Sequence, residues 1–456
     1  MAQDVDPSTV RAVFKAYDVR GLAPEQIDPA LALATGRAHA QVTGADRVVV
    51  GHDMRPTSPA LAAAFAEGAN QAGADVVMIG LASTDQLYFA SGHLGLPGAM
   101  FTASHNPAAY NGIKMCRADA VPIGLDSGLA EIRDLVIDPR PGTEARGSVT
   151  ERDVLRAYAE HLIGLAPVRG RRLKVVIDAG NGMAGHTAPA VFDLLRDQTE
   201  VVSMYFELDG TFPHHDANPI EPENLRDLQA RVLAEGADVG LAFDGDADRC
   251  FLVDERGAAV SPSALTGLIA SRELAKEPGA TVIHNLITSR AVPELVTRLG
   301  GTPVRTRVGH SFIKATMAQT DAVFGGEHSG HFYFRDFWRA DSGMLAALHA
   351  LAALAETDRP LSDLLASFDP YPVSGEINSE VADQQAVIAE IEGLYAGRDS
   401  VTVDRLDGLS VAHDDWTFNV RPSNTEPLLR LNAEGRDHDT MTRVRDEVLA
   451  LIRRDR

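Results

Sequence analysis

Short apolar runs alternate with Ala- and Leu-rich stretches through most of this chain, and the alternation predicts strands followed by helices. The runs at residues 48–50, 175–177 and 239–243 each lead into a turn rich in Gly and Asp. After the first of these turns, residues 59–72 have the pattern of a helix. Strands and helices that alternate in this way form mostly parallel sheets covered by helices. We therefore expect an α/β protein built from several similar units.

The C-terminal part of the chain has a different pattern. Four segments typical of strands follow one another at 401–403, 409–411, 416–420 and 428–432, and a helical segment at 438–453 comes last. Strands that are grouped together and then followed by a helix are typical of an α+β arrangement. We expect a smaller α+β domain here.

Polar segments rich in Pro and Gly interrupt the pattern at residues 138–148, 254–257 and 369–372. Such segments are typical of domain boundaries, and a chain of 456 residues is longer than one hydrophobic core supports. The boundaries predict three α/β domains and the α+β domain, at residues 1–148, 149–256, 257–370 and 371–456.

The charge and the cysteine content narrow the expected partners and location. Asp and Glu number 64 against 42 Lys and Arg, so the net charge of −22 repels nucleic acid and anionic membranes. The two cysteines, Cys116 and Cys250, lack metal-ligand spacing and favour a reducing compartment. The N-terminus lacks the pattern of a signal peptide, and the most apolar helical stretch, 344–355, is too short to span a bilayer. We expect a cytoplasmic, soluble protein.

The segment 102–107, Thr-Ala-Ser-His-Asn-Pro, contains the first candidate for chemistry. The apolar run at 98–101 predicts a buried strand before it, and the Pro and the Asn-Gly pair that follow are turn formers. Ser104 therefore lies at a strand end, where open α/β sheets bind ligands. A serine followed by histidine among small residues is suited to carry a phosphoryl group, although a serine that caps a turn has the same local pattern.

A second candidate is the run of alternate carboxylates Asp244, Asp246 and Asp248, directly after an apolar run. Such side chains can converge on one cation, and hard oxygen ligands favour Mg²⁺ over zinc. A calcium-binding EF-hand loop opens with the same spacing, but Arg249 stands where that loop requires Gly. A solvated acidic turn is the remaining alternative, which the apolar runs on both sides disfavour.

Three further segments carry groups that suit a sugar phosphate. Residues 325–331, Gly-Gly-Glu-His-Ser-Gly-His, suit adjacent sugar hydroxyls, although Gly-rich turns are common. Residues 421–427, Arg-Pro-Ser-Asn-Thr-Glu-Pro, suit a phosphate dianion or form a surface turn. Near the N-terminus, Tyr17 and Arg20 stand beside a Gly, where a cation could meet a phosphate, although a solvated strand end has the same local pattern.

In this order, with one loop in each predicted domain, the loops at Ser104, Asp244, Glu327 and Arg421 resemble those of the α-D-phosphohexomutase superfamily. The similarity spans essentially the whole chain. It implies three related α/β domains with mixed sheets and a smaller α+β C-terminal domain around a central cleft. It also implies a phosphoprotein enzyme of carbohydrate metabolism that requires Mg²⁺.

The resemblance implies a role for each matching residue. Ser104 would be the phosphorylated serine and would bind Mg²⁺ together with the three aspartates. The implied catalytic residues are Ser104, His105, Lys114, Arg20, His331 and Arg249. The implied substrate-binding residues are Tyr17, Arg249, Glu327, Ser329, His331, Arg421, Ser423, Asn424 and Thr425. Lys114 and His331 are both candidates for the general acid and base.

The implied reaction interconverts mannose 6-phosphate and mannose 1-phosphate, with glucose phosphates also accepted, through a hexose 1,6-bisphosphate that also acts as activator. The loop at 326–331 is most similar to the phosphomannomutase/phosphoglucomutase branch. Phosphoglucosamine mutases usually have Gln in place of His328, and such a mutase is one alternative. A catalytically silent sugar-phosphate-binding protein of the same fold is another. The enzyme would be a monomer or a homodimer.

Two positions depart from the family pattern. Ile287 stands where bacterial dual-specificity relatives have lysine, and Arg290 is a nearby cation that could compensate. Asp85 stands where relatives usually have proline, so the conformation of its loop is open at this stage.

Overall fold

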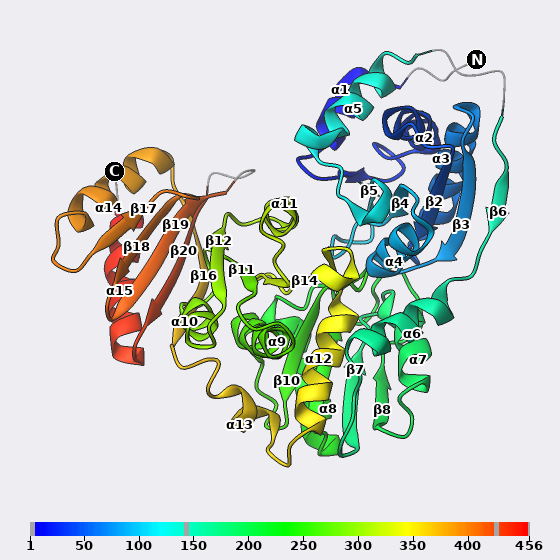
Figure 1. Cartoon of the computed structure of the whole chain (residues 1–456). Coiled ribbons are helices and arrows are strands. Elements are labelled where there is room, and N and C mark those ends of the chain that lie inside the picture. The colour runs from blue at the N-terminus through cyan, green and yellow to red at the C-terminus, as the bar shows by residue number, and fades with distance from the viewer. Residues whose placement is uncertain (1–4, 141–145, 424–427, 455–456) are drawn as a thin grey trace. The chain divides into compact units, whose positions relative to one another are not determined.

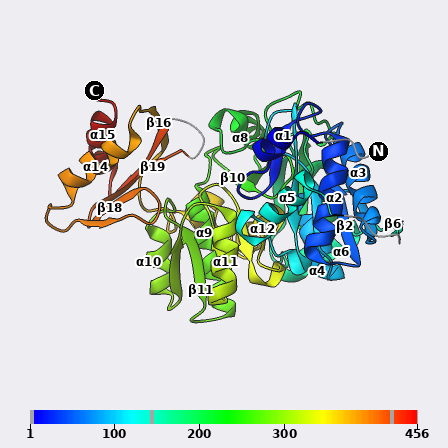
Figure 2. The ribbon, with the colours of Figure 1, turned by 90° about the horizontal axis from the view of Figure 1, so that it is seen from above.

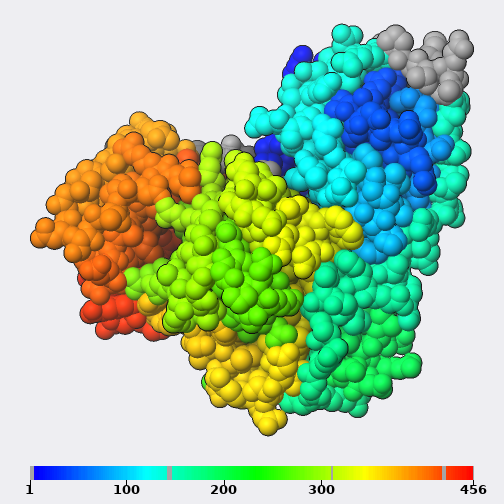
Figure 3. Space-filling model, viewed as in Figure 1, coloured from blue at the N-terminus to red at the C-terminus, as the bar shows by residue number. Residues whose placement is uncertain are grey.

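The structure is a computed structural model that describes residues 5–140, 146–423 and 428–454 (Figure 1). Residues Met1–Val260 and Ser329–Leu364 form one compact unit, and Ser261–His328 and Leu365–Arg456 form the other. In the space-filling view, side chains fill the spaces between the ribbons of each unit (Figure 3).

The first sheet of the first unit mixes parallel and antiparallel strands in the order β1-β5-β4-β2-β3-β6. β2 is parallel to β3 and β4, whereas β5 is antiparallel to β4 and β1. Its strands are β1 (Val19–Leu22), β2 (Arg47–His52), β3 (Asp75–Leu81), β4 (Gly98–Phe101), β5 (Tyr110–Cys116) and β6 (Val149–Glu151). The helices of this region are α1 (Pro7–Val13), α2 (Pro29–Thr43), α3 (Ser58–Gln71), α4 (Thr84–Leu94) and α5 (Leu129–Ile137).

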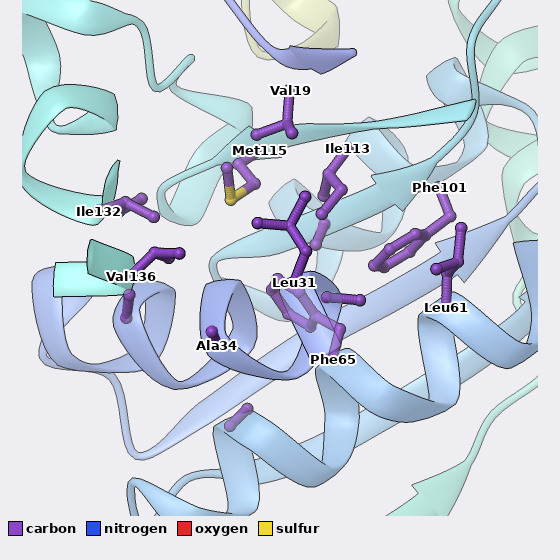
Figure 4. Packing of buried hydrophobic residues seen from close by; sticks show 14 of the residues in the cluster. Val19, Leu31, Ala34, Leu61, Phe65, Phe101, Ile113, Met115, Ile132 and Val136 are labelled. Carbon is purple, nitrogen blue, oxygen red and sulfur yellow. The ribbon is translucent and has the colours of Figure 1, made fainter. Parts of the chain in front are cut away.

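Local sequence signals set the ends of α2. The Asp28 carboxylate accepts a hydrogen bond from the Leu31 backbone N–H at 2.8 Å, and Gly44 ends the helix in the left-handed conformation. α2 and α3 lie side by side (Figures 1 and 2). Leu31 of α2 and Phe65 of α3 pack in one hydrophobic cluster with Phe101 of β4 (Figure 4). This core holds the carboxyl end of β4 in place.

The second sheet has the order β10-β9-β7-β8, with β10 antiparallel to β9 and the other pairs parallel. α8 packs against β7 and β9, and α12 packs against β10. The strands are β7 (Leu173–Asp178), β8 (Thr199–Met204), β9 (Val239–Phe243) and β10 (Cys250–Asp254), and the helices are α6 (Leu155–Leu165), α7 (Ala184–Asp193), α8 (Arg226–Glu235) and α12 (Gly343–Ala355). The short strands β14 (Phe332–Phe334) and β15 (Ala340–Asp341) pair antiparallel in the same unit.

The second unit contains parallel strands and an antiparallel sheet. β11 is parallel to both β12 and β13. These strands and their helices are β11 (Thr281–Asn285), β12 (Thr302–Thr306), β13 (Phe324–Gly326), α9 (Pro262–Lys276), α10 (Ala291–Arg298) and α11 (His310–Thr320). The short helix α13 (Leu361–Leu365) lies where the chain passes from the first unit to the second.

The C-terminal antiparallel sheet has the order β16-β20-β19-β18-β17. Tyr395, Trp416 and Phe418 form its aromatic core. The elements are β16 (Val373–Glu380), α14 (Gln384–Tyr395), β17 (Thr402–Asp404), β18 (Leu409–His413), β19 (Trp416–Pro422), β20 (Leu428–Gly435) and α15 (His438–Ile452). The predicted α+β arrangement of this region is confirmed.

The predicted mixed sheets with helices are also confirmed. The strands expected at 98–101 and 239–243 have those bounds as β4 and β9, and the helix expected at 59–72 is α3. Among the described residues, every helix falls short of the length and apolar character needed to cross a bilayer.

We expect Gly68→Ala to lower the thermal unfolding midpoint, because α2 and α3 approach closely at this glycine. An added Cβ would stand 1.9 Å from the Leu33 carbonyl oxygen, and such overpacking costs about 1–3 kcal/mol. Gly164→Ala on α6 is the matched control, since its Cβ would meet nothing within 4 Å and alanine favours a helix by about 1 kcal/mol. Calorimetry measures both midpoints. An unchanged midpoint for Gly68→Ala would contradict the tight packing of the two helices.

Candidate active site

Ser104 lies just beyond the carboxyl end of β4, as the sequence pattern predicts. Its backbone is left-handed, with φ at 50°, which is uncommon for a residue other than glycine. The Ser104 backbone N–H donates to Thr102 Oγ1 at 2.9 Å, and its hydroxyl donates to Asp244 Oδ2 at 2.8 Å. Ser104 is therefore held in an unusual conformation beside a carboxylate, which differs from a simple turn cap.

Asp244, Asp246 and Asp248 converge just beyond the carboxyl end of β9. All three are fully or almost fully buried, and their ligand atoms lie within 4.8 Å of one another. Asp246 Oδ1 and Asp248 Oδ1 are buried and accept no hydrogen bond from the described residues. Burial raises the pKa of Asp244 to about 8, because gathering carboxylates away from water is unfavourable without a cation. This donor set fits a divalent metal ion.

Two cationic side chains partly compensate the carboxylates. Arg249 Nε donates to Asp244 Oδ2 at 2.9 Å. Lys114 Nζ, on β5, donates to Asp246 Oδ2 at 2.7 Å and to Asp248 Oδ2 at 2.6 Å. Burial alone would lower the pKa of Lys114, but the two carboxylates raise that pKa well above its usual value. Lys114 is therefore a charged ammonium in this arrangement.

His105 and Arg20 border the serine in the same unit. His105 Nδ1 lies 3.3 Å from Ser104 Oγ. Burial, together with the charges of Arg249 and Arg20, lowers the pKa of His105 well below its usual value, so its imidazole is neutral. Arg20 Nη1 donates to Asn106 Oδ1 at 2.7 Å, which ties β1 to the serine loop. Tyr17 is half-buried in the segment between α1 and β1.

Ser329 and His331 also belong to the first unit. Ser329 Oγ and His331 Nδ1 lie 3.0 Å apart, and His331 Nε2 lies 3.6 Å from Asp248 Oδ1. The chain at His331 forms an antiparallel bridge with Arg249, so this loop is joined to the end of the carboxylate cluster. Gly330 between them has a φ of 86°, and a Cβ there would stand 2.4 Å from the Phe251 ring.

The second unit contains the predicted Glu327, Arg421 and Ser423. Glu327 follows β13 and is buried, and its Oε1 accepts a hydrogen bond from the Gly309 N–H at 3.1 Å. Arg421 Nη2 donates to Glu376 Oε2 at 2.7 Å, while the buried Arg421 Nε has no hydrogen-bond partner among the described residues. The Ser423 N–H donates to the Leu428 carbonyl at 2.8 Å. Asn424 and Thr425 lie outside the described residues.

The structure thus brings most of the predicted site residues of the first unit together. In the first unit, the serine, the aspartates, Lys114, Arg249 and His331 form one cluster. In the second unit, Arg421 has an acidic partner, Glu376, that sequence reasoning did not identify. The catalytic and binding roles of all these residues stay predictions.

Sequence reasoning also missed three residues of the first unit that lie just after strand ends. Thr84 Oγ1 donates to Asp246 Oδ2 at 2.6 Å. Asp53 and Arg55 form a buried ion pair, with 3.2 Å between Asp53 Oδ2 and Arg55 Nε. An Asp followed two residues later by an Arg, directly after the apolar run of β2, is the signal that could have found this pair.

Asp85, which departs from the family pattern, is fully buried at the start of α4. It accepts hydrogen bonds from the hydroxyls of Tyr158 at 2.7 Å and Ser342 at 2.6 Å, and from Ser83. Ser83 Oγ also accepts from the Gln86 N–H and so caps α4. The conformation left open by the sequence is therefore a capped helix start.

The other position that departs from the family pattern, Ile287, lies in the second unit. Ile287 lines a cavity of about 60 Å³ together with Arg305 and Glu434. Compensation by Arg290 for the family's lysine stays a prediction, and the structure gives the contacts of its side chain. Its Nη1 donates to the Asp414 carbonyl at 2.8 Å, and its guanidinium lies 4.1 Å from the centre of the Tyr371 ring.

Comparison with family models matches the chain in four consecutive parts. The descriptions are phosphoglucomutase/phosphomannomutase alpha/beta/alpha domains I, II and III and the C-terminal domain of the same family. The matched residues are 11–138, 156–257, 261–371 and 376–451.

Curated proteins and solved structures of the same family match this chain over nearly its full length. A phosphomannomutase of Salmonella typhimurium is 42% identical over 448 residues, which cover 96% of this chain and 98% of that protein. A protein of Xanthomonas campestris described as phosphohexose mutases is also 42% identical, covering 97% and 99%. A crystal structure of a phosphoglucomutase/phosphomannomutase family protein from Burkholderia thailandensis has a TM-score of 0.88 at 33% identity, covering 97% and 98%.

The stability of the protein should depend on pH through Asp85. Burial raises the pKa of Asp85 to about 7, against about 4 in an unfolded chain. The folded protein therefore binds the proton of the Asp85 carboxyl more tightly than the unfolded chain does. The free energy that this proton adds to folding is fully present below about pH 4 and is lost as the pH rises through about 7. Asp85→Asn cannot titrate, so its unfolding free energy minus that of wild type should rise between about pH 4 and 7 and then level off. Urea unfolding at several pH values measures this difference, and a flat difference would contradict the shifted pKa.

Proposed function

This chain belongs to the phosphoglucomutase/phosphomannomutase family, and we infer that it is an isomerase that interconverts mannose 6-phosphate and mannose 1-phosphate. The observation that carries the proposal is the buried Ser104 hydroxyl 2.8 Å from Asp244, at the edge of a three-carboxylate cluster. Full-length relatives named phosphomannomutase support mannose phosphates as substrates. The catalytic cluster supports phosphoryl transfer as the reaction.

We propose that Ser104 carries the phosphoryl group between turnovers. In the first transfer, the bond between phosphorus and Ser104 Oγ breaks, and a bond forms to the free hydroxyl oxygen of the sugar monophosphate. A base accepts the proton of that hydroxyl, and the product is a hexose 1,6-bisphosphate. In the second transfer the other phosphate returns to Ser104, and a proton is given to the oxygen it leaves. The remaining sugar monophosphate is the isomer of the substrate.

The three aspartates and Ser104 would hold Mg²⁺, which fits their oxygen donors. When bound, the ion offsets the negative charge that develops on the transferring group. Arg249 would add a fixed positive charge beside Asp244, and Arg20 would orient the serine loop through Asn106. Neutral His105 would lie beside Ser104 Oγ, while Lys114 and His331 are the two candidates for moving the proton.

The remaining predicted residues would bind the substrate. Glu327 and Ser329 would accept and donate hydrogen bonds to sugar hydroxyls, and Tyr17 and His331 would border the reacting phosphate. Arg421 would bind the phosphate that does not react, together with Ser423, Asn424 and Thr425. A planar guanidinium suits a phosphate dianion, and the Arg421 Nε that has no hydrogen-bond partner among the described residues supports this role.

We also propose finer points that depend on this assignment. The four domains would extend over residues 1–148, 149–256, 257–370 and 371–456. A hexose 1,6-bisphosphate would act as activator, glucose phosphates would also be substrates, and the enzyme would act as a monomer or homodimer. Cys116 and Cys250 are buried and form no disulfide, which supports a cytoplasmic location.

The experiment that tests the substrate compares initial rates on mannose, glucose and glucosamine 1-phosphates with the same bisphosphate activator. We expect the highest kcat/KM for mannose 1-phosphate, with glucose 1-phosphate also converted. A large preference for glucosamine 1-phosphate would replace the proposal with a phosphoglucosamine mutase. Binding of all three without turnover would favour a catalytically silent protein.

Ser104→Ala should abolish nearly all mutase turnover and leave the fold intact, because Ser104 lies in a loop beyond β4. Loss of a covalent nucleophile lowers kcat by about 10⁴-fold or more. Intact-mass analysis should find one phosphoryl group on the wild-type protein and none on the variant. Ser329→Ala is a control whose phosphoryl content should stay at the wild-type level. Normal turnover by Ser104→Ala would exclude the carrier role.

A further inference from the structure

We propose that Arg55 is the positioning residue that sets the geometry of the Ser104 loop for phosphoryl transfer, an inference that rests on the proposed function. Arg55 follows the carboxyl end of β2, the strand next to β4 in the first sheet. Its side chain is almost completely buried, with 1% of the residue exposed. A guanidinium is costly to bury, so its hydrogen bonds indicate what it does.

Both terminal nitrogens of Arg55 donate to backbone carbonyls of the serine loop. Nη2 donates to the carbonyl oxygens of Ser104 at 3.0 Å and Asn106 at 2.6 Å. Nη1 donates to those of Pro107 at 2.9 Å and Tyr110 at 2.9 Å. The four N–H groups of the two nitrogens are thus used on three carbonyls of the serine loop and on that of Tyr110, the first residue of β5. A lysine ammonium has three N–H groups on a single atom and cannot reproduce this planar pattern.

The loop needs such an anchor because Ser104 is strained. A non-glycine residue in a sparsely populated backbone region costs about 1–3 kcal/mol and persists only when its surroundings hold it. Thr102 binds the Ser104 N–H, and Arg55 binds the Ser104 carbonyl, so both sides of the residue are fixed. The strained backbone in turn directs Ser104 Oγ toward Asp244.

Arg55 is itself held from two sides. Asp53 lies 3.2 Å from Arg55 Nε and also accepts hydrogen bonds from the Arg55 N–H at 3.0 Å and from Ser58 Oγ at 2.6 Å. The Phe212 ring lies 5.1 Å from the guanidinium carbon. Gly210 lies so close that a Cβ there would stand 2.7 Å from the Arg55 Cα. The guanidinium is therefore paired, covered and kept away from water.

This arrangement links Arg55 to the chemical step and not to substrate binding. Its donors are spent on the loop, so it has no terminal N–H group left for a phosphate. Misplacing a reacting group by about 1 Å can cost about 100-fold in rate. Loosening the loop should therefore lower kcat and leave the Michaelis constant nearly unchanged.

The test is Arg55→Lys, measured with mannose 1-phosphate and bisphosphate activator. We expect kcat to fall about 100-fold with KM within about threefold of wild type. Amide hydrogen exchange over residues 104–110 should become faster. Arg171→Lys is the matched control, because Arg171 also binds a carbonyl and an aspartate. It lies just before the amino end of β7, whereas the site residues follow the carboxyl ends of strands. That control should keep both kcat and loop protection.

A kcat for Arg55→Lys within about threefold of wild type would overturn the proposal, as would unchanged exchange in the loop. A lowered melting temperature with normal kcat would mean that Arg55 only stabilises the fold, and would also overturn it. If Arg55→Lys does not fold, Asp53→Asn applies the same test, with an expected fall in kcat of about tenfold at unchanged KM; unchanged kcat would overturn the proposal. Lack of Ser104 phosphate and of turnover in the wild-type enzyme would instead refute the proposed function, while the exchange measurement still reports on Arg55.

Discussion

The constraint on which the rest of the first unit depends is the burial of three carboxylates beside a serine hydroxyl. Asp244, Asp246 and Asp248 lie within 4.8 Å of one another with almost no exposure, so their mutual repulsion is poorly screened. Lys114 and Arg249 offset part of that charge, and a divalent cation fits the carboxylate oxygens that accept no hydrogen bond in the described parts of the chain. A site that attracts positive charge so strongly also suits a phosphoryl group once a cation is bound.

The serine beside this cluster is controlled by its backbone. Ser104 has a left-handed backbone, with its N–H bound to the Thr102 hydroxyl and its carbonyl bound to the buried Arg55 guanidinium. Buried polar contacts also fix the start of α4. Thr84 donates to Asp246, and Asp85 accepts from a hydroxyl of α6 and from the hydroxyl that caps α12. Buried polar networks of this kind specify one geometry when every member is satisfied.

The strands and many of the residues that follow them could be predicted from the sequence, because the patterns that indicate them are local. The apolar runs at 98–101 and 239–243 predict strands with the observed bounds, and the serine and aspartates that follow them lie at strand ends. The spacing of the aspartates alone indicates a cation site, and four ordered loops indicate the family. The phosphate-binding role of Arg421 stays a prediction. Its pairing with Glu376 on β16 is invisible in the sequence, because nothing local relates positions 45 residues apart.

The sequence by itself determined the succession of strands and helices, the loops that carry reactive groups and the chemistry that those groups can perform. The tertiary structure decided which charges meet. Lys114 binds an aspartate 132 residues away, Thr84 binds the same aspartate from 162 residues away, and Arg55 binds the serine loop from 49 to 55 residues away. Strand order brings these segments together, and strand order depends on how the whole core packs, which no local pattern encodes.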